Sequence, residues 1–441
     1  MTESRDSASG RLRRVLGVGF GVAVIVGSML GIGILRTPGL VAGSLHSSSV
    51  TLIVWILGGL YTLLGSICLA ELGTMSPEAG GYYVYARRAF GDTAGFVVGW
   101  TDWLTYCAVL GYASIGIAEF AGLLWPALAG ATTWIAIAAL VFFVALQWAG
   151  IRVSSRFQEI TTALKFAAFL ALVAAALFWS PNVSAAADAS LGPLTLAGAI
   201  AGVQSVVIAY GGWQSALYFT EEDRDPTRNL PRAMIGGVVS VIVIYLLINI
   251  ALLAVLPIAT LAHSTLPAAD AAAVLAGDRG RQAITVVSLL SLPPLLNAIM
   301  MIGTRILYGL GRDGFVSSRV TSINARGTPD VATIVTTIVA VGLIATGTFQ
   351  RLVAIASFFL AANYAICCLA LFALRRREPD AARPFRAWGY PWSAAIVLIG
   401  AFAFLVGALV GDTTNGLAAL GLAAAGVVIR KMTPGVFLQK T

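Results

Sequence analysis

Long runs of apolar residues without a single charge recur along the whole of this chain. Examples of about twenty residues or more are 15–35, 50–70, 282–304, 331–350 and 387–411, and a helix that crosses a bilayer needs roughly 20 apolar residues. Apolar types make up 58% of the 441 residues and charged types only 11%, whereas a soluble domain carries about 25% charged residues. The sequence therefore predicts an all-α, polytopic membrane protein.

We expect twelve transmembrane helices. Their predicted ranges are 15–44, 50–73, 93–123, 131–150, 158–180, 194–220, 232–257, 282–312, 330–349, 351–375, 393–411 and 413–430. Lys and Arg gather in the loops on the cytoplasmic side of a membrane. With the N-terminus inside, 22 of the 28 Lys and Arg residues fall in inside segments, and the outside loops hold Arg279, Arg281 and Arg351. The sequence thus predicts a multi-pass protein of the cell membrane with cytoplasmic tails at 1–14 and 431–441.

Glycine-rich interruptions lie in the middle of the first and sixth predicted spans. The first reads VGSMLGIGIL at 26–35, and the sixth reads IAYGGWQS at 208–215. Glycine costs about 1 kcal/mol relative to alanine in a helix interior, and paired interruptions of this kind point to a transporter's substrate site. Close helix packing is the alternative explanation. Because the interruptions lie five spans apart, we expect inverted five-helix repeats at 15–180 and 194–375, followed by two accessory helices at 393–430.

Unpaired peptide groups at such breaks can bind a zwitterion. N–H groups near Gly31 and Gly33 form the positive end of a helix dipole and suit a carboxylate. Carbonyl groups near Ser28, Ile208 and Ala209 can accept hydrogen bonds from an ammonium group, and an amino acid carries both charges on one carbon. The predicted substrate-binding residues at the breaks are Ser28, Met29, Leu30, Gly31, Ile32, Gly33, Ile208, Ala209, Tyr210, Gly211 and Gly212.

Charged residues inside the predicted spans are a second signal of function. Lys165 lies in the fifth span, where it either bridges carbonyl groups freed by the first break or extends its ammonium group to the membrane surface. Asp102, Glu71 and Arg305 lie closer to the cytoplasmic ends of their spans. We expect these three side chains to form structural or gating ion pairs.

Other classes of function find little support. The net charge is +8, but the basic residues do not form the single patch of a nucleic-acid-binding protein. The sequence has neither a P-loop nor a His-Glu-x-x-His motif, and its only histidines, His46 and His263, fall in predicted outer loops. We therefore expect no enzyme activity, metal or cofactor. A channel would need a polar pore lining or a filter motif, whereas an amino-acid sensor without flux stays an alternative.

Several short motifs are distributed along the chain and are specific in combination. They lie at 33–39, 71–74, 80–91, 209–222 (AYGGWQSALYFTEE), 225–233 (DPTRNLPRA), 304–314 and 375–384. Together they resemble a known family, the amino acid–polyamine–organocation superfamily, and within it the L-type amino-acid transporters and their bacterial relatives. The resemblance covers nearly the whole chain.

The resemblance implies a LeuT-type fold with discontinuous helices 1 and 6 and transport by alternating access. It implies that Lys165 stands in for a sodium ion, so that transport would be sodium-independent, and it adds Tyr245 and Asn363 to the expected pocket. Ile208 departs from the pattern, because many relatives have an aromatic gate there. The four cysteines lie in apolar runs, and the outer loop after the third span contains none, so we expect no disulfide-linked accessory subunit.

The expected substrate follows from the side chains around the two breaks. No acidic residue stands at either break to pair with a cationic side chain, and Ile208, Gly211 and Gly212 leave apolar room. We therefore predict secondary active transport of neutral amino acids, by exchange or by proton coupling. Cationic amino acids or polyamines are the alternative substrates.

Overall fold

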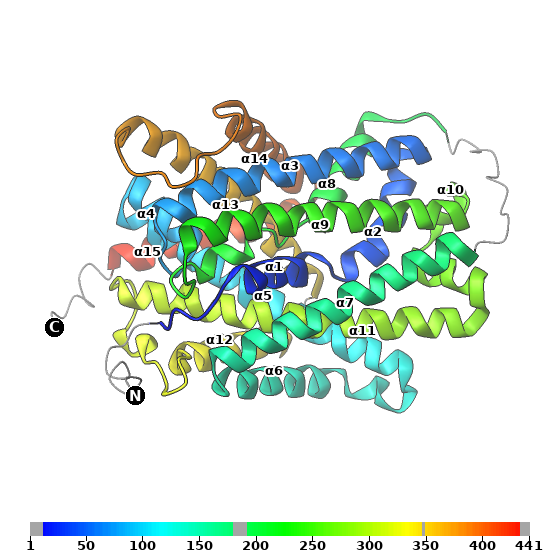
Figure 1. Cartoon of the computed structure of the whole chain (residues 1–441), viewed down its shortest axis with the longest axis horizontal. Coiled ribbons are helices and arrows are strands. Elements are labelled where there is room, and N and C mark those ends of the chain that lie inside the picture. The colour runs from blue at the N-terminus through cyan, green and yellow to red at the C-terminus, as the bar shows by residue number, and fades with distance from the viewer. Residues whose placement is uncertain (1–11, 180–191, 346–348, 433–441) are drawn as a thin grey trace.

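The computed structural model describes residues 12–179, 192–345 and 349–432, and the described residues form a helical bundle without a named strand (Figure 1). In chain order the α-helices are α1 Val18–Met29, α2 Ile32–Leu45, α3 Ser48–Met75, α4 Tyr82–Phe90, α5 Asp92–Leu124, α6 Thr132–Trp148, α7 Ile151–Trp179, α8 Leu196–Ala209, α9 Pro226–Val255, α10 Ile258–His263, α11 Pro267–Arg312, α12 Asp330–Ala345, α13 Phe349–Arg377, α14 Trp392–Gly411 and α15 Thr413–Met432. Three short 3₁₀ helices are η2 Pro126–Ala131, η3 Ser215–Phe219 and η4 Ser318–Thr321.

Within the described ranges each predicted span overlaps a helix of the bundle, and the number of twelve membrane crossings remains a prediction. Among the described residues, eight helices are long and apolar enough to cross a membrane, namely α3, α5, α7, α9, α11, α13, α14 and α15. The pair α1 and α2 passes the same test as one bent span, and α6, α8 and α12 are shorter apolar helices. The prediction of a polytopic helical membrane protein is confirmed, whereas the inverted repeats and the domain boundaries remain predictions.

Local sequence signals fix several helix ends. Thr195 caps α8 by accepting a hydrogen bond from the Gly198 N–H at 3.0 Å, which satisfies one of the free N–H groups of the first turn. Helices α9 and α11 begin with Pro226 and Pro267, since proline at the first position has no N–H to leave unpaired. At the other end of α2, His46 adopts the left-handed conformation with φ of 58°.

Helix α4 and the first part of α11 are two of the helical regions that lie outside the predicted spans. Helix α4 follows the second span, and its tyrosines Tyr82, Tyr83 and Tyr85 are buried. Helix α11 starts near the predicted outer loop and reaches its predicted span only after a break at Ala276 and Gly277, which have non-helical backbone angles. The hydropathy pattern missed both regions because α4 is short and contains two arginines, and the first part of α11 carries Asp270 and Asp278.

The arginine-rich segments of the chain lie together at one end of the bundle. Figure 1 shows α4, the start of α9, the end of α11 and the end of α13 at its left-hand side. We call this the arginine-rich end, and it contains the arginines around residues 87, 224–232, 312–326 and 375–386. The described chain begins and ends there as well. This arrangement agrees with an even number of membrane crossings and with a positive cytoplasmic side.

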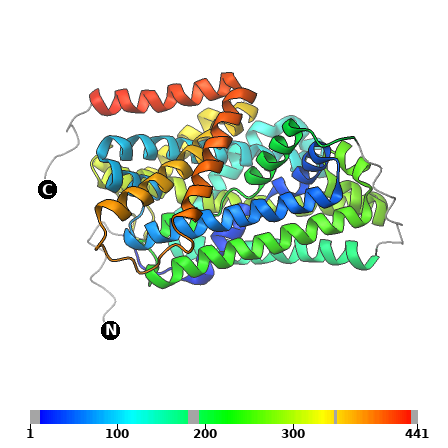
Figure 2. The same ribbon diagram turned by 90° about the horizontal axis from the view of Figure 1, so that it is seen from above.

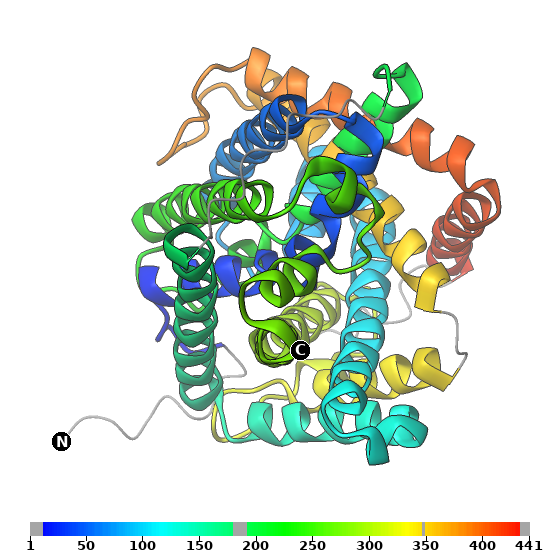
Figure 3. The same ribbon diagram turned by 90° about the vertical axis from the view of Figure 1, so that its right-hand side faces the viewer.

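The broken helices lie inside the bundle, and the accessory helices lie at its edge. Figures 2 and 3 show α14 and α15 at the periphery, on the side of the molecule opposite α9 and α7. Large apolar side chains of α14 point outward, with Trp392 exposed by 75% and Val410 by 79%. Apolar surface of this kind suits contact with lipid, whereas Val24, Ile25 and Leu30 at the first break are fully buried.

Candidate functional site

The first predicted break is present in the structure. Helix α1 ends at Met29, Leu30 leaves helical geometry with ψ of 92°, and Gly31 is extended before α2 begins at Ile32. The segments Val18–Met29 and Gly33–Leu45 are bent by 47° relative to each other. Helix α2 has no side-chain cap at its N-terminus, so the N–H groups of its first turn are available to a ligand.

The second predicted break is present as well. Helix α8 ends at Ala209, a turn follows, and η3 resumes at Ser215. Gly212 has φ of +111°, a conformation that residues with a Cβ rarely adopt. A Cβ on Gly212 would lie 2.9 Å from the Ser28 carbonyl carbon and 3.0 Å from the Met29 nitrogen. The two breaks therefore touch at Gly212, and only a glycine permits this approach.

Tyr245 of α9 connects the two breaks. Its hydroxyl oxygen lies 2.6 Å from the Met29 carbonyl oxygen and 3.0 Å from the Ala209 carbonyl oxygen. A hydroxyl group has a single hydrogen, so the two carbonyl groups share it. Its ring packs against Trp55 and Tyr210, with centroids 5.5 and 4.9 Å away. The tyrosine thus satisfies peptide groups that neither helix can pair internally.

Replacing Tyr245 with phenylalanine should weaken substrate binding by about tenfold, because the variant leaves two buried carbonyl groups without a donor, at a cost of about 1–2 kcal/mol. Binding to the purified protein, measured by isothermal titration with L-leucine, checks this. Ser240→Ala is the control, because the Ser240 hydroxyl group on the same helix also donates a hydrogen bond to a carbonyl group, that of Gly236 at 2.8 Å, and Ser240 is not among the cavity-lining residues. This variant should bind L-leucine as wild type does. Equal affinities of Tyr245→Phe and wild type would contradict the bridging role.

Lys165 of α7 is buried beside the first break. Its Nζ lies 2.9 Å from the Gly27 carbonyl oxygen of α1 and 2.9 Å from the Ser291 carbonyl oxygen of α11. The side chain is 1% exposed, so the alternative in which it extends to the membrane surface is wrong. The ammonium group instead joins three helices by charge-assisted hydrogen bonds.

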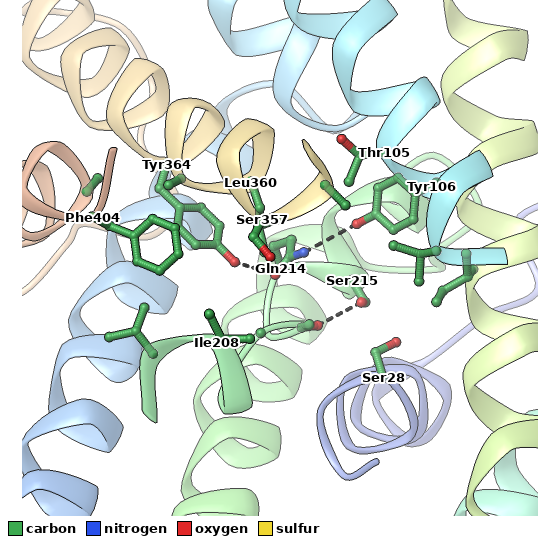
Figure 4. A pocket seen from close by; sticks show the side chains of 18 of the residues that line it. Ser28, Thr105, Tyr106, Ile208, Gln214, Ser215, Ser357, Leu360, Tyr364 and Phe404 are labelled. Carbon is green, nitrogen blue, oxygen red and sulfur yellow. Dashed lines mark hydrogen bonds between the residues drawn. The ribbon is translucent and has the colours of Figure 1, made fainter. Parts of the chain in front are cut away.

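A cavity of about 160 Å³ lies beside the two breaks (Figure 4). Its walls come from α1, α3, α5, α8, α11, α13 and α14, with the segment around η3. The lining residues are Ser28, Tyr61, Thr105, Tyr106, Val109, Tyr112, Val207, Ile208, Gly211, Gly212, Gln214, Ser215, Leu295, Ile299, Ala356, Ser357, Leu360, Ala361, Tyr364, Ala401 and Phe404. The Ser28 Oγ is buried and has no hydrogen-bond partner, which leaves its hydroxyl group for a ligand.

The predicted site residues divide into those that line this cavity and those that support it. Lining residues are Ser28, Ile208, Gly211 and Gly212. Of the others, Met29, Leu30, Gly31, Gly33, Ala209, Tyr210, Tyr245, Asn363 and Lys165 are not among the lining residues, and the side chain of Ile32 lies outside the part of the chain that the structure describes. Tyr210 donates a hydrogen bond to the Trp55 carbonyl oxygen at 3.1 Å, and a Cβ on Gly33 would lie 3.9 Å from the Ala209 Cα. These residues shape the backbone around the cavity.

Carbonyl groups expected to bind an ammonium group are partly occupied by the protein itself. The Ile208 oxygen accepts a hydrogen bond from the Gly211 N–H at 2.9 Å, and the Ala209 oxygen accepts one from Tyr245. A carbonyl oxygen has two lone pairs, so each can accept one further bond. The structure therefore limits the predicted ammonium site to one remaining lone pair on each of these carbonyl oxygens, because a ligand has to share them with the protein.

Sequence reasoning missed the polar side chains that line the cavity from other helices. Gln214 donates a hydrogen bond to the Tyr106 hydroxyl oxygen at 3.3 Å and accepts one from the Tyr364 hydroxyl group at 3.1 Å (Figure 4). Tyr364 lines the cavity on α13, whereas the sequence analysis expected its neighbour Asn363 to do so. The available signal was a glutamine inside an otherwise apolar span, next to the glycines of the second break.

A layer of buried polar side chains separates the cavity from the arginine-rich end. We call it the polar layer, and it consists of Asp102, Tyr218, Glu222, Arg305 and Asn363. Helices α5 and α11 each pass from cavity residues to a member of this layer toward the arginine-rich end, and on α13 Asn363 lies between the cavity residues Ala361 and Tyr364. All five residues are buried, so the layer closes this side of the cavity.

Two of the three expected ion pairs are present. Arg305 forms two hydrogen bonds of 3.0 Å with Glu222. Arg375 contacts Glu71 at 2.5 Å, and Arg383 lies 3.3 Å from the same carboxylate. The expectation is wrong for Asp102, which has no basic partner in the part of the chain that the structure describes. Its carboxylate accepts hydrogen bonds from Tyr218 and Asn363 instead.

Comparison with known proteins agrees with this geometry. A family model described as amino acid permease matches residues 21–428. The chain belongs to this family. The permease is 27% identical over 412 residues to the serine/threonine exchanger SteT of Bacillus subtilis (strain 168), a match that covers 92% of the permease and 93% of the relative. The resemblance seen in the sequence is thereby confirmed.

Two mammalian relatives extend the comparison of the permease. The b(0,+)-type amino acid transporter 1 of Mus musculus is 30% identical over 425 residues, which cover 92% of the permease and 84% of the relative. The large neutral amino acids transporter small subunit 2 of Homo sapiens is 28% identical over 393 residues, with coverage of 85% and 72%. All three relatives are named as transporters or exchangers of amino acids.

Metal chemistry finds no support at the site. Within the described ranges, no group of three or more His, Cys, Asp or Glu side chains is placed to hold a metal ion. The relatives are transporters rather than enzymes. The site is a small cavity beside two helix breaks. The breaks provide backbone N–H donors and carbonyl acceptors, and the wall carries the unpaired Ser28 hydroxyl group.

Proposed function

We propose that the permease carries neutral amino acids across the cell membrane by alternating access and without sodium. The observation that carries this proposal is the chemistry of the cavity wall, because none of its lining side chains is charged. A charged side chain of a substrate would be buried there without a partner, which is costly. A cavity of about 150 Å³ accommodates a molecule as large as benzene, so about 160 Å³ suits a small or medium-sized amino acid.

The two breaks provide binding groups for the amino and carboxyl groups of such a substrate. The free N–H groups at the start of α2, at Gly31, Ile32 and Gly33, suit a carboxylate. The second lone pairs of the carbonyl groups at Ile208 and Ala209 suit an ammonium group, and the unpaired Ser28 hydroxyl group can bond to either. The substrate side chain then occupies the part of the cavity lined by Val207, Ile299 and Phe404.

Lys165 supports sodium-independent transport. Its ammonium group already satisfies the Gly27 and Ser291 carbonyl oxygens, and carbonyl oxygens are the ligands that a sodium ion would need. An ammonium group at this position repels a second cation. The lysine therefore supplies the structural bridge that would otherwise require an ion.

The same proposal includes the arrangement of the chain in the membrane. The arginine-rich end faces the cytoplasm with both termini, and two inverted five-helix repeats surround the breaks. All four cysteines of the chain are buried and unpaired, so a disulfide bond to an accessory subunit would require a buried thiol to become exposed. We propose that the permease works without such a link.

Uptake into proteoliposomes tests the proposed function. Proteoliposomes that contain the purified permease are loaded with unlabelled amino acid. Radiolabelled L-serine, L-leucine, L-lysine or L-glutamate is then added outside, in sodium chloride or in choline chloride. We expect uptake of the two neutral amino acids at equal rates in both salts. Binding without uptake would identify a sensor, and uptake that requires sodium would overturn sodium independence.

A further inference from the structure

Three carboxylates in the bundle are fully buried, and one of them differs from the other two. Glu71, Glu222 and Asp102 are each 0% exposed. Glu71 is paired with two arginines and Glu222 with Arg305, as expected for buried charges. Asp102 has no Lys, Arg or His partner within the described ranges. A carboxylate without a fixed counter-charge can gain and lose a proton, and this exception therefore suggests a function in which the charge of Asp102 changes.

Asp102 accepts two hydrogen bonds from neutral groups. The Tyr218 hydroxyl group donates to one carboxylate oxygen at 2.9 Å, and the Asn363 Nδ2 donates to the other at 3.2 Å. The titratable groups within electrostatic reach are Tyr82 of α4, Tyr106 of α5, Tyr218 of η3, and Tyr364 and Cys367 of α13. On α11, which packs along α5, the buried Arg305 is committed to Glu222.

These surroundings place no fixed positive charge next to the carboxylate. An ionised carboxylate is costly to bury unless a cation accompanies it. Asp102 therefore has two stable forms, a neutral form that carries a proton and an ionised form that requires water or another cation to reach it. Intramembrane carboxylates of this type act as proton relays in pumps and transporters.

Asp102 lies directly behind the cavity wall. It precedes Thr105 and Tyr106 by one helical turn on α5, and both of these residues line the cavity. The side chains of Tyr106 and Tyr218 are hydrogen-bonded to each other, and their rings meet edge to face with centroids 5.4 Å apart. Gln214 binds the Tyr106 hydroxyl group from the cavity side. A row of hydroxyl and amide groups therefore connects the cavity to the carboxylate.

We propose that Asp102 is the proton-binding site of a proton-coupled transport cycle, which rests on the proposed transport function. One proton from the outer solution enters through the cavity and binds a carboxylate oxygen of Asp102, which becomes neutral. When the polar layer opens, the proton leaves to water at the arginine-rich end together with the amino acid. A zwitterion has no net charge, so each cycle moves one positive charge.

Direct binding of a cationic substrate explains the geometry less well. Asp102 is not among the cavity-lining residues, whereas Tyr106, Gln214 and Tyr364 are. These three side chains stand between the substrate space and the carboxylate. A proton can pass along hydroxyl groups, but the ammonium group of a lysine or polyamine would have to displace them.

The test compares wild type with Asp102→Asn in proteoliposomes that contain a trapped pH-sensitive dye. Glu119→Gln is the matched control, because Glu119 is an exposed carboxylate on the same helix. Asp102→Glu is the conservative variant. Two quantities are measured for radiolabelled L-serine, L-leucine and L-lysine: uptake driven by an inside-alkaline pH gradient, and counterflow exchange at equal pH on both sides.

We expect the gradient to raise wild-type uptake several-fold and the dye to report acidification of the lumen. Asp102→Asn should lose both signals but keep counterflow, since asparagine keeps an acceptor for Tyr218 and cannot bind the proton. Asp102→Glu should regain part of the coupling, and Glu119→Gln should match wild type. Retained counterflow also shows that Asp102→Asn is folded.

Three results would overturn the proposal. Gradient-driven uptake with lumen acidification in Asp102→Asn would do so, as would wild-type uptake that does not respond to the pH gradient although counterflow at equal pH is present; in the latter case the proposed transport function would stand. Loss of L-lysine uptake in Asp102→Asn without a change in the dye signal would assign Asp102 to recognition of a cationic side chain. Absence of both uptake and counterflow in wild type would instead refute the proposed function itself.

Discussion

Uptake by Lys165→Ala is expected to fall at least about 100-fold relative to wild type. The variant removes two charge-assisted hydrogen bonds, from Nζ to the Gly27 and Ser291 carbonyl oxygens. Bonds of this class contribute about 1.5–3 kcal/mol each, and each 1.4 kcal/mol is a factor of ten in an equilibrium. Without them α1 is no longer held to α7 and α11, so the first break loses the geometry that presents its peptide groups.

The matched control is Lys431→Ala, because Lys431 is an exposed lysine on the peripheral helix α15. It should transport L-leucine at the wild-type rate in the same proteoliposomes. Size-exclusion profiles of both variants separate lost transport from lost folding. Wild-type uptake and affinity in a well-folded Lys165→Ala protein would disprove the bridging role of the lysine.

Adding a single methyl group at Gly212 is expected to abolish transport almost completely. In Gly212→Ala the new Cβ would meet the Ser28 carbonyl carbon at 2.9 Å and the Met29 nitrogen at 3.0 Å, and these are backbone atoms that cannot rotate away. The φ of +111° adds backbone strain, of about 1–3 kcal/mol. The two breaks have to move apart, which displaces Ser28 from the cavity wall and reduces L-leucine binding.

Gly236→Ala provides the control for this prediction. Gly236 lies on α9, and a Cβ there would meet no heavy atom within 4 Å. Alanine is favoured over glycine in a helix by about 1 kcal/mol, so this variant should be as stable as wild type and fully active. Binding and uptake of L-leucine by the two variants should therefore differ by more than tenfold. Equal activity would show that the breaks do not need the close contact at Gly212.

Local patterns were sufficient for the parts of the structure that depend on neighbouring residues. The apolar runs predicted the apolar helices of the bundle, and the glycines at 26–35 and 208–215 predicted both interruptions. The lysine inside the fifth span pointed to a buried partner, and its carbonyl acceptors are near the first break as expected. These features follow from one helix and the bilayer around it, which is why a sequence pattern can reveal them.

Side chains that meet across the bundle were harder to predict. Asn363 was expected in the pocket, but the neighbouring Tyr364 lines the cavity, since a shift of one residue turns a helical side chain by about 100°. Asp102 was expected in an ion pair, but none of the arginines in the described ranges reaches it. Arg305 bonds to Glu222 and Arg375 to Glu71, choices among several carboxylates and arginines that the sequence leaves open.

The sequence by itself determined that this chain crosses a membrane many times, and it predicted the two helix breaks and a lysine within a membrane span. Hydropathy and glycine content act over one or two helical turns, so they can be read in chain order. Only the tertiary structure decided which side chains line the cavity and which carboxylate stays without a counter-charge. Those outcomes depend on the rotation and depth of helices that are far apart in the chain, and packing of the whole bundle sets both.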